Sequence, residues 1–217
     1  MSGHPSPLLQ IHRPDGTLVS GRTRVRAAPR KGEICDLCAA ALAEPHSHLA
    51  DLVSRSLLCV CRPCFLLFLP DGAARGRYRP VPERYLALPA TDGARWDQLD
   101  IPIGLAFLFY NSAIGRVAAL YPSPAGATES ALPFDAWSDM VASVPELSTL
   151  APDVEAVLVR RTRGHHDTFI VPIDACYELA GIVRRDWKGF DGGDVAAQAI
   201  DAFFDRVRSR SQAGVTP

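Results

Sequence analysis

The sequence predicts an α+β fold in which a small cysteine-knuckle module precedes an antiparallel sheet with helices on one face. Five of the six cysteines fall within thirty residues, which is typical of a metal-binding module. Two 17-residue segments in the second half each contain an apolar strand, a polar turn, a second apolar strand and a proline, as a hairpin does. With 217 residues and 47 % hydrophobic content, the chain can bury one main core beside the module.

The first 32 residues form a lead-in that is rich in proline and glycine. They include a basic run from Arg22 to Lys31, which we interpret as a solvated, poorly ordered tail rather than a docking segment. The whole chain has a formal net charge of -1 and a pI near 6.6. Because such a chain has no overall attraction to polyphosphate, nucleic-acid binding is not expected as its main purpose.

Residues 33–69 contain the cysteine module. Its two Cys-x-x-Cys pairs, Cys35 with Cys38 and Cys61 with Cys64, are separated by 22 residues. Each pair needs only one tight turn to direct both sulfurs at a common centre about 2.3 Å away, so we predict a four-sulfur metal site. Four protein ligands leave no open position for hydrolytic catalysis, so the predicted site is structural or electron-transferring.

Three further side chains are alternative ligands. Cys59 lies two residues before Cys61, and a strand there would place both on the same face, so Cys59 either replaces one of the quartet or stays free. His46 and His48 lie two residues apart in a loop and can both face a site, in which case an imidazole releases one cysteine. The ligand set therefore stays open among seven candidates.

The local pattern predicts the other parts of the module. We expect a short helical turn at 39–43, a strand at 57–60, and an apolar segment at 65–69 that packs the module onto the rest of the protein. Residues 70–92, which contain repeated prolines and glycines, predict a linker.

The location of the protein is predicted from its most apolar stretch and its N-terminus. Residues 57–69 are too short to span a bilayer, and Arg62 and Pro63 interrupt them, so no membrane insertion is expected. The first residues show no secretory signal, and closely spaced cysteines in a reducing compartment indicate metal ligands before disulfides. We therefore expect a cytoplasmic protein.

Residues 93–210 predict the α+β domain. Residues 106–122 and 156–172 each predict a hairpin, and two paired hairpins would give a four-stranded antiparallel sheet. A helix-compatible segment opens after Pro133 and another after Pro172. These segments carry Asp135 and Asp174 where a carboxylate caps a helix or opposes its dipole. The pattern indicates two strand-strand-helix units, which a duplication would explain.

The rest of this domain gives weaker signals. The first unit contains an inserted loop at 123–132, which is either a binding loop or a plain surface connection. Apolar residues at helical spacing predict a final helix at 195–210, followed by a flexible tail at 211–217. We find no phosphate loop, dinucleotide fingerprint, nucleophile elbow or metalloprotease helix, so the sequence does not favour an enzyme.

Several motifs together resemble an uncharacterised family found mainly in actinobacteria. The motifs are the cysteine and histidine cluster of 35–64, Gly76-Arg-Tyr-Arg79, the segment 121–130, the segment 172–179, and Gly189-Phe-Asp-Gly-Gly193. The resemblance covers roughly residues 33–210. It implies a gene neighbourhood of high-affinity nickel-iron uptake hydrogenases, and it supplies no catalytic residues.

This resemblance implies a metal-binding accessory protein in the assembly, maturation or electron wiring of a nickel-iron hydrogenase, with a hydrogenase subunit or maturation protein as partner. The knuckles resemble those of rubredoxin, whose Fe(Cys)4 centre carries one electron. Rubredoxins usually have glycine where Ala39 and Phe65 stand, and Cys59 is additional. Zinc in a ribbon or treble-clef brace is therefore favoured over iron. Two alternatives stay open: a zinc-ribbon protein that binds nucleic acid or regulates, and a metal-dependent enzyme with an open Cys/His site.

Overall fold

The structure is a computed structural model that describes residues 33–70, 72–89, 104–123, 126–130, 134–162, 165–189 and 192–213. The predicted lead-in at 1–32, part of the predicted linker (71 and 90–92) and most of the predicted tail (214–217) lie outside the described residues. The side chain of Asp135, for which a capping role is predicted, also lies outside them.

The cysteine module is built on a small three-stranded sheet with the order β2-β1-β3. Its elements are β1 (Ser47–Asp51), β2 (Ser56–Val60), α1 (Arg62–Leu66), the 3-10 turn η1 (Ala73–Gly76) and β3 (Tyr78–Pro80). β1 and β2 form an antiparallel hairpin, and β3 pairs with the other edge of β1. The module has its own small core, in which Leu49 and Val60 are fully buried beside Phe65.

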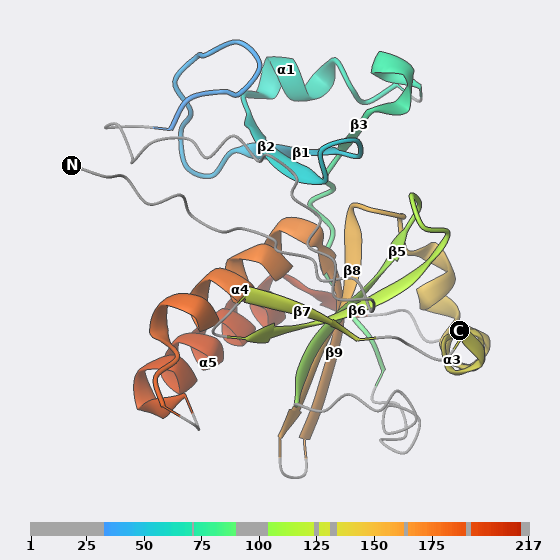
Figure 1. Cartoon of the computed structure of the whole chain (residues 1–217), viewed down its shortest axis with the longest axis vertical. Coiled ribbons are helices and arrows are strands. Elements are labelled where there is room, and N and C mark those ends of the chain that lie inside the picture. The colour runs from blue at the N-terminus through green and yellow to red at the C-terminus, as the bar shows by residue number, and fades with distance from the viewer. Residues whose placement is uncertain are drawn as a thin grey trace, which may run out of the picture.

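The main domain contains a seven-stranded sheet with the order β10-β4-β9-β8-β5-β6-β7 (Figure 1). Its strands are β4 (Leu86–Ala87), β5 (Leu105–Asn111), β6 (Arg116–Ser123), β7 (Gly126–Ser130), β8 (Glu155–Thr162), β9 (His165–Pro172) and β10 (Gln212–Ala213). Both predicted hairpins are present, as β5-β6 and β8-β9, and they join through antiparallel pairing of β5 with β8. β10 runs parallel to β4, and the other pairs of described strands are antiparallel. The predicted α+β class is confirmed.

Helical segments cover both faces of this sheet. They are α3 (Phe134–Ser143), the 3-10 turn η2 (Pro145–Thr149), α4 (Ile173–Asp186) and α5 (Gly193–Arg210). Neighbouring residues on one strand contact different layers: Phe107 packs in the core beneath α4 and α5, whereas Leu108 packs against α3 and η2. The expected cover on one face is thus provided by α4 and α5, and α3 and η2 add a second layer. Strands that are apolar on both faces need both layers.

The internal duplication stays a prediction. The two hairpins and the helices after them are present, but α3 and α4 lie on opposite faces of the sheet. The two units therefore differ in the face of the sheet on which the helix after the hairpin packs.

Four local expectations differ from the structure, and one of them is the predicted flexible tail at 211–217, in which residues 212–213 form β10. Residues 39–43 form no helical turn, because Ala41 pairs with Ile34 in a bridge and closes a tight loop. Within the predicted loop at 123–132, residues 126–130 form the edge strand β7; 124–125 and 131–132 lie outside the described residues. Residues 78–80 and 86–87, inside the range predicted as a linker, form β3 and β4.

The module is attached through its hairpin and not through 65–69. Phe65 is buried inside the module, while Leu66, Leu67 and Leu69 are exposed. Instead, Ala50 lies in the main core, with two leucines of the hairpin packed against it. Figure 1 accordingly shows α1 on the side of the module away from the main sheet. The apolar character of 65–69 reflects one core residue followed by surface leucines.

Polar contacts also join chain segments that lie far apart in sequence. The Arg84 guanidinium donates two hydrogen bonds to the carboxylate of Glu155, at 2.8 and 2.7 Å, and Glu155 is only 1 % exposed. Arg79 donates to the carbonyl of Pro152 and to the carboxylate of Asp153.

Among the described residues, no helix is both long enough and apolar enough to traverse a lipid bilayer.

Candidate metal centre

The four cysteines of the two predicted pairs converge in the module. The Sγ atoms of Cys35, Cys38, Cys61 and Cys64 all lie within 4.8 Å of one another, and those of Cys38 and Cys61 are 3.6 Å apart. A tetrahedral metal with metal-sulfur bonds of about 2.3 Å holds its sulfurs roughly 3.8 Å apart. A disulfide needs about 2.05 Å, and the described cysteines are free thiols. The quartet can therefore hold one metal ion.

The first pair lies on a hydrogen-bonded knuckle. The N–H of Ala39 donates to the Cys35 carbonyl, and the N–H of Asp36 donates to the carbonyl of Cys59 on β2. In return, the Asp36 carboxylate accepts a hydrogen bond from the Cys59 N–H. Ala39 has a φ of 60°, the left-handed conformation that favours glycine. The knuckle thus keeps its turn geometry with alanine at the position where rubredoxins usually have glycine.

The second pair lies at the start of α1 rather than in a second equivalent loop. Cys61 is the N-cap residue of α1, Pro63 lies in the first turn, and Cys64 lies within the helix. Proline suits this place because it has no N–H to lose and its φ fits a helix. The hairpin β1-β2 carries the chain from the first pair to the second, so knuckle, hairpin and helix together position the four sulfurs.

Burial and charge differ across the quartet. Cys35 and Cys64 are buried, whereas Cys38 is exposed and Cys61 is half-buried, so one edge of the cluster faces solvent. Burial raises the pKa of Cys35, but backbone N–H groups of Cys61, Cys38 and Leu37 outweigh it and lower that pKa to about 6. The neighbouring Cys61 sulfur, followed by burial, raises the pKa of Cys64 to about 12. Four close sulfurs thus do not all ionise by themselves, and a bound cation would release their protons.

The three alternative ligands form a cluster of their own. The ligand atoms of His46, His48 and Cys59 lie within 4.8 Å of one another. His48 and Cys59 are directly opposite residues of β1 and β2, whose side chains share one face of the hairpin. Because β2 ends at Val60, Cys61 belongs to the start of α1 and joins the other cluster. The seven candidates therefore separate into a set of four and a set of three.

The set of three lies against the main domain. His48 Nδ1 is 2.8 Å from Asp174 Oδ2 in the first turn of α4. Burial lowers the pKa of His48, but hydrogen bonds to Asp174 and Cys59 raise it to about 10. The sequence predicts Asp174 only as a helix-start carboxylate. No local pattern indicates its contact with a histidine 126 positions away.

Two cavities lie between the module and the main domain. The first, which we call the module groove, measures about 990 Å³ and is lined by the set of three, by Tyr85, and by Asp174 and Glu178 of α4. The second, which we call the hairpin pocket, measures about 270 Å³ and lies between the β1-β2 hairpin and strands β5 and β6. Leu57 and Tyr177 line both cavities.

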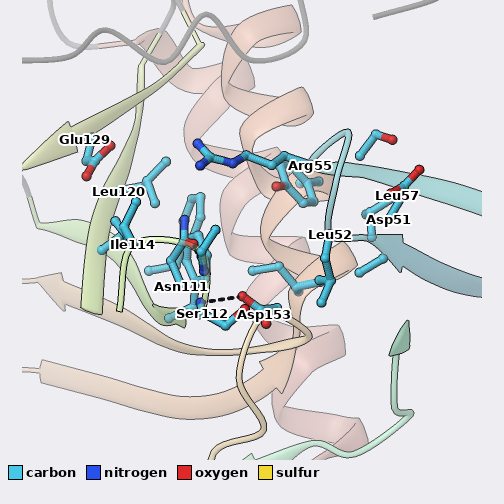
Figure 2. A pocket seen from close by; sticks show the side chains of 18 of the residues that line it. Asp51, Leu52, Arg55, Leu57, Asn111, Ser112, Ile114, Leu120, Glu129 and Asp153 are labelled. Carbon is cyan, nitrogen blue, oxygen red and sulfur yellow. Dashed lines mark hydrogen bonds between the residues drawn. The ribbon is translucent and has the colours of Figure 1, made fainter. Parts of the chain in front are cut away.

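The hairpin pocket is mostly apolar, with polar groups at its rim. Figure 2 shows the Arg55 guanidinium extending from the β1-β2 turn toward the side on which Leu120 and Glu129 lie. In the lower part of this view, the N–H of Ser112 donates to Asp153 at 2.8 Å. The pocket walls therefore come from both halves of the molecule.

Together, the fold and the site define an α+β protein with a four-cysteine module that could hold a metal ion. The sequence profile of DUF5947, a family of unknown function, matches residues 34–211, so the chain belongs to this family. No curated protein and no solved structure matches the chain.

Proposed function

We propose that this protein is a metal-binding accessory protein that acts in the assembly, maturation or electron wiring of a nickel-iron hydrogenase. The observation that carries the metal function is the convergence of four free cysteine sulfurs within 4.8 Å. The hydrogenase role is supported by the motif resemblance described above. The partner would be a hydrogenase subunit or a maturation protein, encountered in the cytoplasm.

Zinc is the metal that we propose for the four-cysteine site, with iron as the alternative. Both metals accept four thiolates in tetrahedral geometry. The two Cys-x-x-Cys pairs are not equivalent here, because one lies on a loop and the other opens α1. This order of knuckle, hairpin and helix resembles a treble-clef brace more than the paired loops of a rubredoxin. A zinc ion there would brace the module and leave the partner contact to its surface.

The outer surface of the module supports such a contact. Leu37, between the two cysteines of the first pair, is 39 % exposed, and Leu67, just after the second pair, is 68 % exposed. Leu66 and Leu69 are also exposed. Exposed apolar side chains that gather on one element often mark a protein-protein contact. Leu37 lies between the ligands of the first pair, Leu66 ends α1, and Leu67 and Leu69 follow it, so a partner bound there would contact the segments around the metal ligands.

The decisive experiment has a metal readout and a cellular readout. The protein purified from its own host should contain one tightly held metal at the four-cysteine site: colourless for zinc, red and reducible for iron. Deleting its gene should impair hydrogenase processing, nickel incorporation or hydrogen oxidation. Complementation with Cys61→Ser should fail, whereas Cys176→Ala, at a buried cysteine outside both clusters, should restore function. A deletion strain in which all three hydrogenase properties are unchanged would refute the proposed role.

A Leu67→Ser variant separates the partner contact from metal binding. Because Leu67 is largely exposed, its loss should leave metal content and stability unchanged. If the outer surface binds the partner, the variant should nevertheless complement the deletion poorly. Val53→Ser is the matched control, since Val53 is 75 % exposed on the β1-β2 turn at the other end of the hairpin.

A further inference from the structure

We propose that His46, His48 and Cys59 form a second metal site, separate from the four-cysteine site, which binds a divalent cation of the zinc type and leaves one coordination position open to the module groove. This site does not depend on the proposed hydrogenase role. It rests on the arrangement of three side chains and on how two of them are held.

The first observation is the ligand geometry. One nitrogen from each imidazole and the Cys59 sulfur lie within 4.8 Å of one another, and the two rings have centroids 4.8 Å apart at an angle of 58°. His48 and Cys59 are fixed opposite each other by the β1-β2 register, and His46 directly precedes β1. Two imidazoles and a thiolate are ligands that zinc uses in proteins. Small side-chain movements suffice to bring all three to one ion.

The second observation is the unsatisfied state of His46. Its side chain is only 9 % exposed, yet neither ring nitrogen makes a hydrogen bond. The carboxylates of Glu33 and Glu44 approach the two nitrogens at 3.3 and 3.5 Å without hydrogen-bonding geometry. A buried polar group without a hydrogen-bond partner destabilises the fold. A metal ion at this place would satisfy one nitrogen, and a nearby carboxylate could then accept from the other.

The third observation is the orientation of His48. Its Nδ1 is 2.8 Å from Asp174 Oδ2, which leaves Nε2 for a metal. Histidines that bind metals usually donate their second ring N–H to a carboxylate, which fixes the ring and makes the ligating nitrogen more basic. Asp174 therefore acts as a positioning residue, and it comes from α4 of the main domain. The site is complete only when module and domain are in contact.

The open position defines what the site can bind. Three protein ligands with a free fourth position are the arrangement of zinc sites that hold solvent or a substrate atom. His46, His48 and Cys59 all line the module groove, so the free position faces this groove. There it can hold water, or an anionic oxygen or sulfur atom of a molecule that enters.

The test is metal stoichiometry of the full chain. The metal-free protein is titrated with Zn²⁺, and the bound ions are counted by native mass spectrometry. Wild type should bind two equivalents, and Cys59→Ser and His46→Ala should each bind one. Asp174→Asn should keep both sites but weaken the second about 10- to 100-fold, as loss of an outer carboxylate does. Cys176→Ala is the matched cysteine control and should bind two.

Cobalt distinguishes the two sites by colour. Co²⁺ at the four-cysteine site gives intense sulfur charge-transfer bands, and a site with one sulfur gives much weaker ones. The Cys59→Ser variant should keep the intense spectrum, which shows that the module is folded, and lose only the second equivalent. Wild type that binds a single equivalent, or a Cys59→Ser variant that still binds two, would overturn the second site. Either result would leave the four-cysteine site, and the function proposed for it, untouched.

Discussion

His48 and Asp174 are joined by a 2.8 Å contact between Nδ1 and Oδ2, although 126 positions separate them in the sequence. This contact joins β1 of the module to the first turn of α4. We expect His48→Gln and Asp174→Asn to be non-additive, with a coupling of about 1 to 2 kcal/mol, because each removes the partner of a partly buried, charge-assisted hydrogen bond. The coupling free energy is measured by urea unfolding of the wild type, both single variants and the double variant. Each protein carries one equivalent of zinc. Additive effects would show that the contact contributes nothing to attachment.

Metal removal should unfold the module selectively. The module core contains five buried residues, two of which are the ligands Cys35 and Cys64, whereas the main sheet has separate cores on its two faces. After a chelator removes the metal, we expect rapid hydrogen exchange at 35–66 and continued protection of β8 and β9. Hydrogen exchange followed by mass spectrometry resolves the two regions. Equal loss of protection in both would mean that the domain needs the metal to fold.

Acid should weaken the attachment of β1 to the segment before β3. Burial raises the pKa of Asp51, but hydrogen bonds from Arg77 and from Ser54 and Val53 outweigh it and lower the pKa from 3.8 to about 2. Because the folded pKa is depressed, the contribution is fully present above about pH 4 and is lost as the pH falls toward 2. The shift corresponds to about 2 kcal/mol.

Asp51→Asn provides the control for this pH dependence. The variant should be less stable than wild type at pH 6, and the difference in free energy of unfolding should shrink as the pH falls from about 4 to about 2. Thiolate ligands also protonate in acid, but they do so in both proteins, so their effect on the free energy of unfolding cancels in the difference. A difference that stays constant over this range would contradict the assigned role of Asp51.

Arg84→Met should destabilise the main domain by about 3 kcal/mol, because it leaves the carboxylate of Glu155 buried without its cation. The double variant Arg84→Met with Glu155→Gln should recover much of this loss, since a neutral amide costs less to bury and can still accept from the Ala151 N–H. Thermal or urea unfolding at neutral pH measures both. A double variant that is less stable than Arg84→Met would contradict this explanation.

Local sequence spacing was sufficient to predict the four-cysteine cluster and the two hairpins. Each Cys-x-x-Cys pair needs one turn, and each hairpin places its strands side by side with only a short connection. The same local reasoning left the place of Cys59 open, because alternation along a strand holds only while the strand continues, and β2 ends at Val60. The face covered by α3 was not predictable either, since strands that are apolar on both faces accept a helix on either one.

Contacts that depend on the assembled fold were not visible in the sequence. β3 and β4 are three and two residues long, and only their partner strands identify them as strands. In the sequence, Asp174 is recognisable only as an acidic residue at the start of a helix. Its contact with His48 forms only when α4 packs against the module. Sequence reasoning therefore identified the seven candidate ligands but could not divide them into two clusters.

The hairpin pocket has a mechanical consequence for the whole molecule. Its walls come from the β1-β2 hairpin on one side and from β5 and β6 on the other, so it exists only while the two halves touch. An apolar molecule bound in it would stabilise the contact between the module and the main domain, because separating the two would expose the bound molecule and both walls to water. Binding in this pocket would therefore favour contact between the two halves, and separating the halves would release the bound molecule.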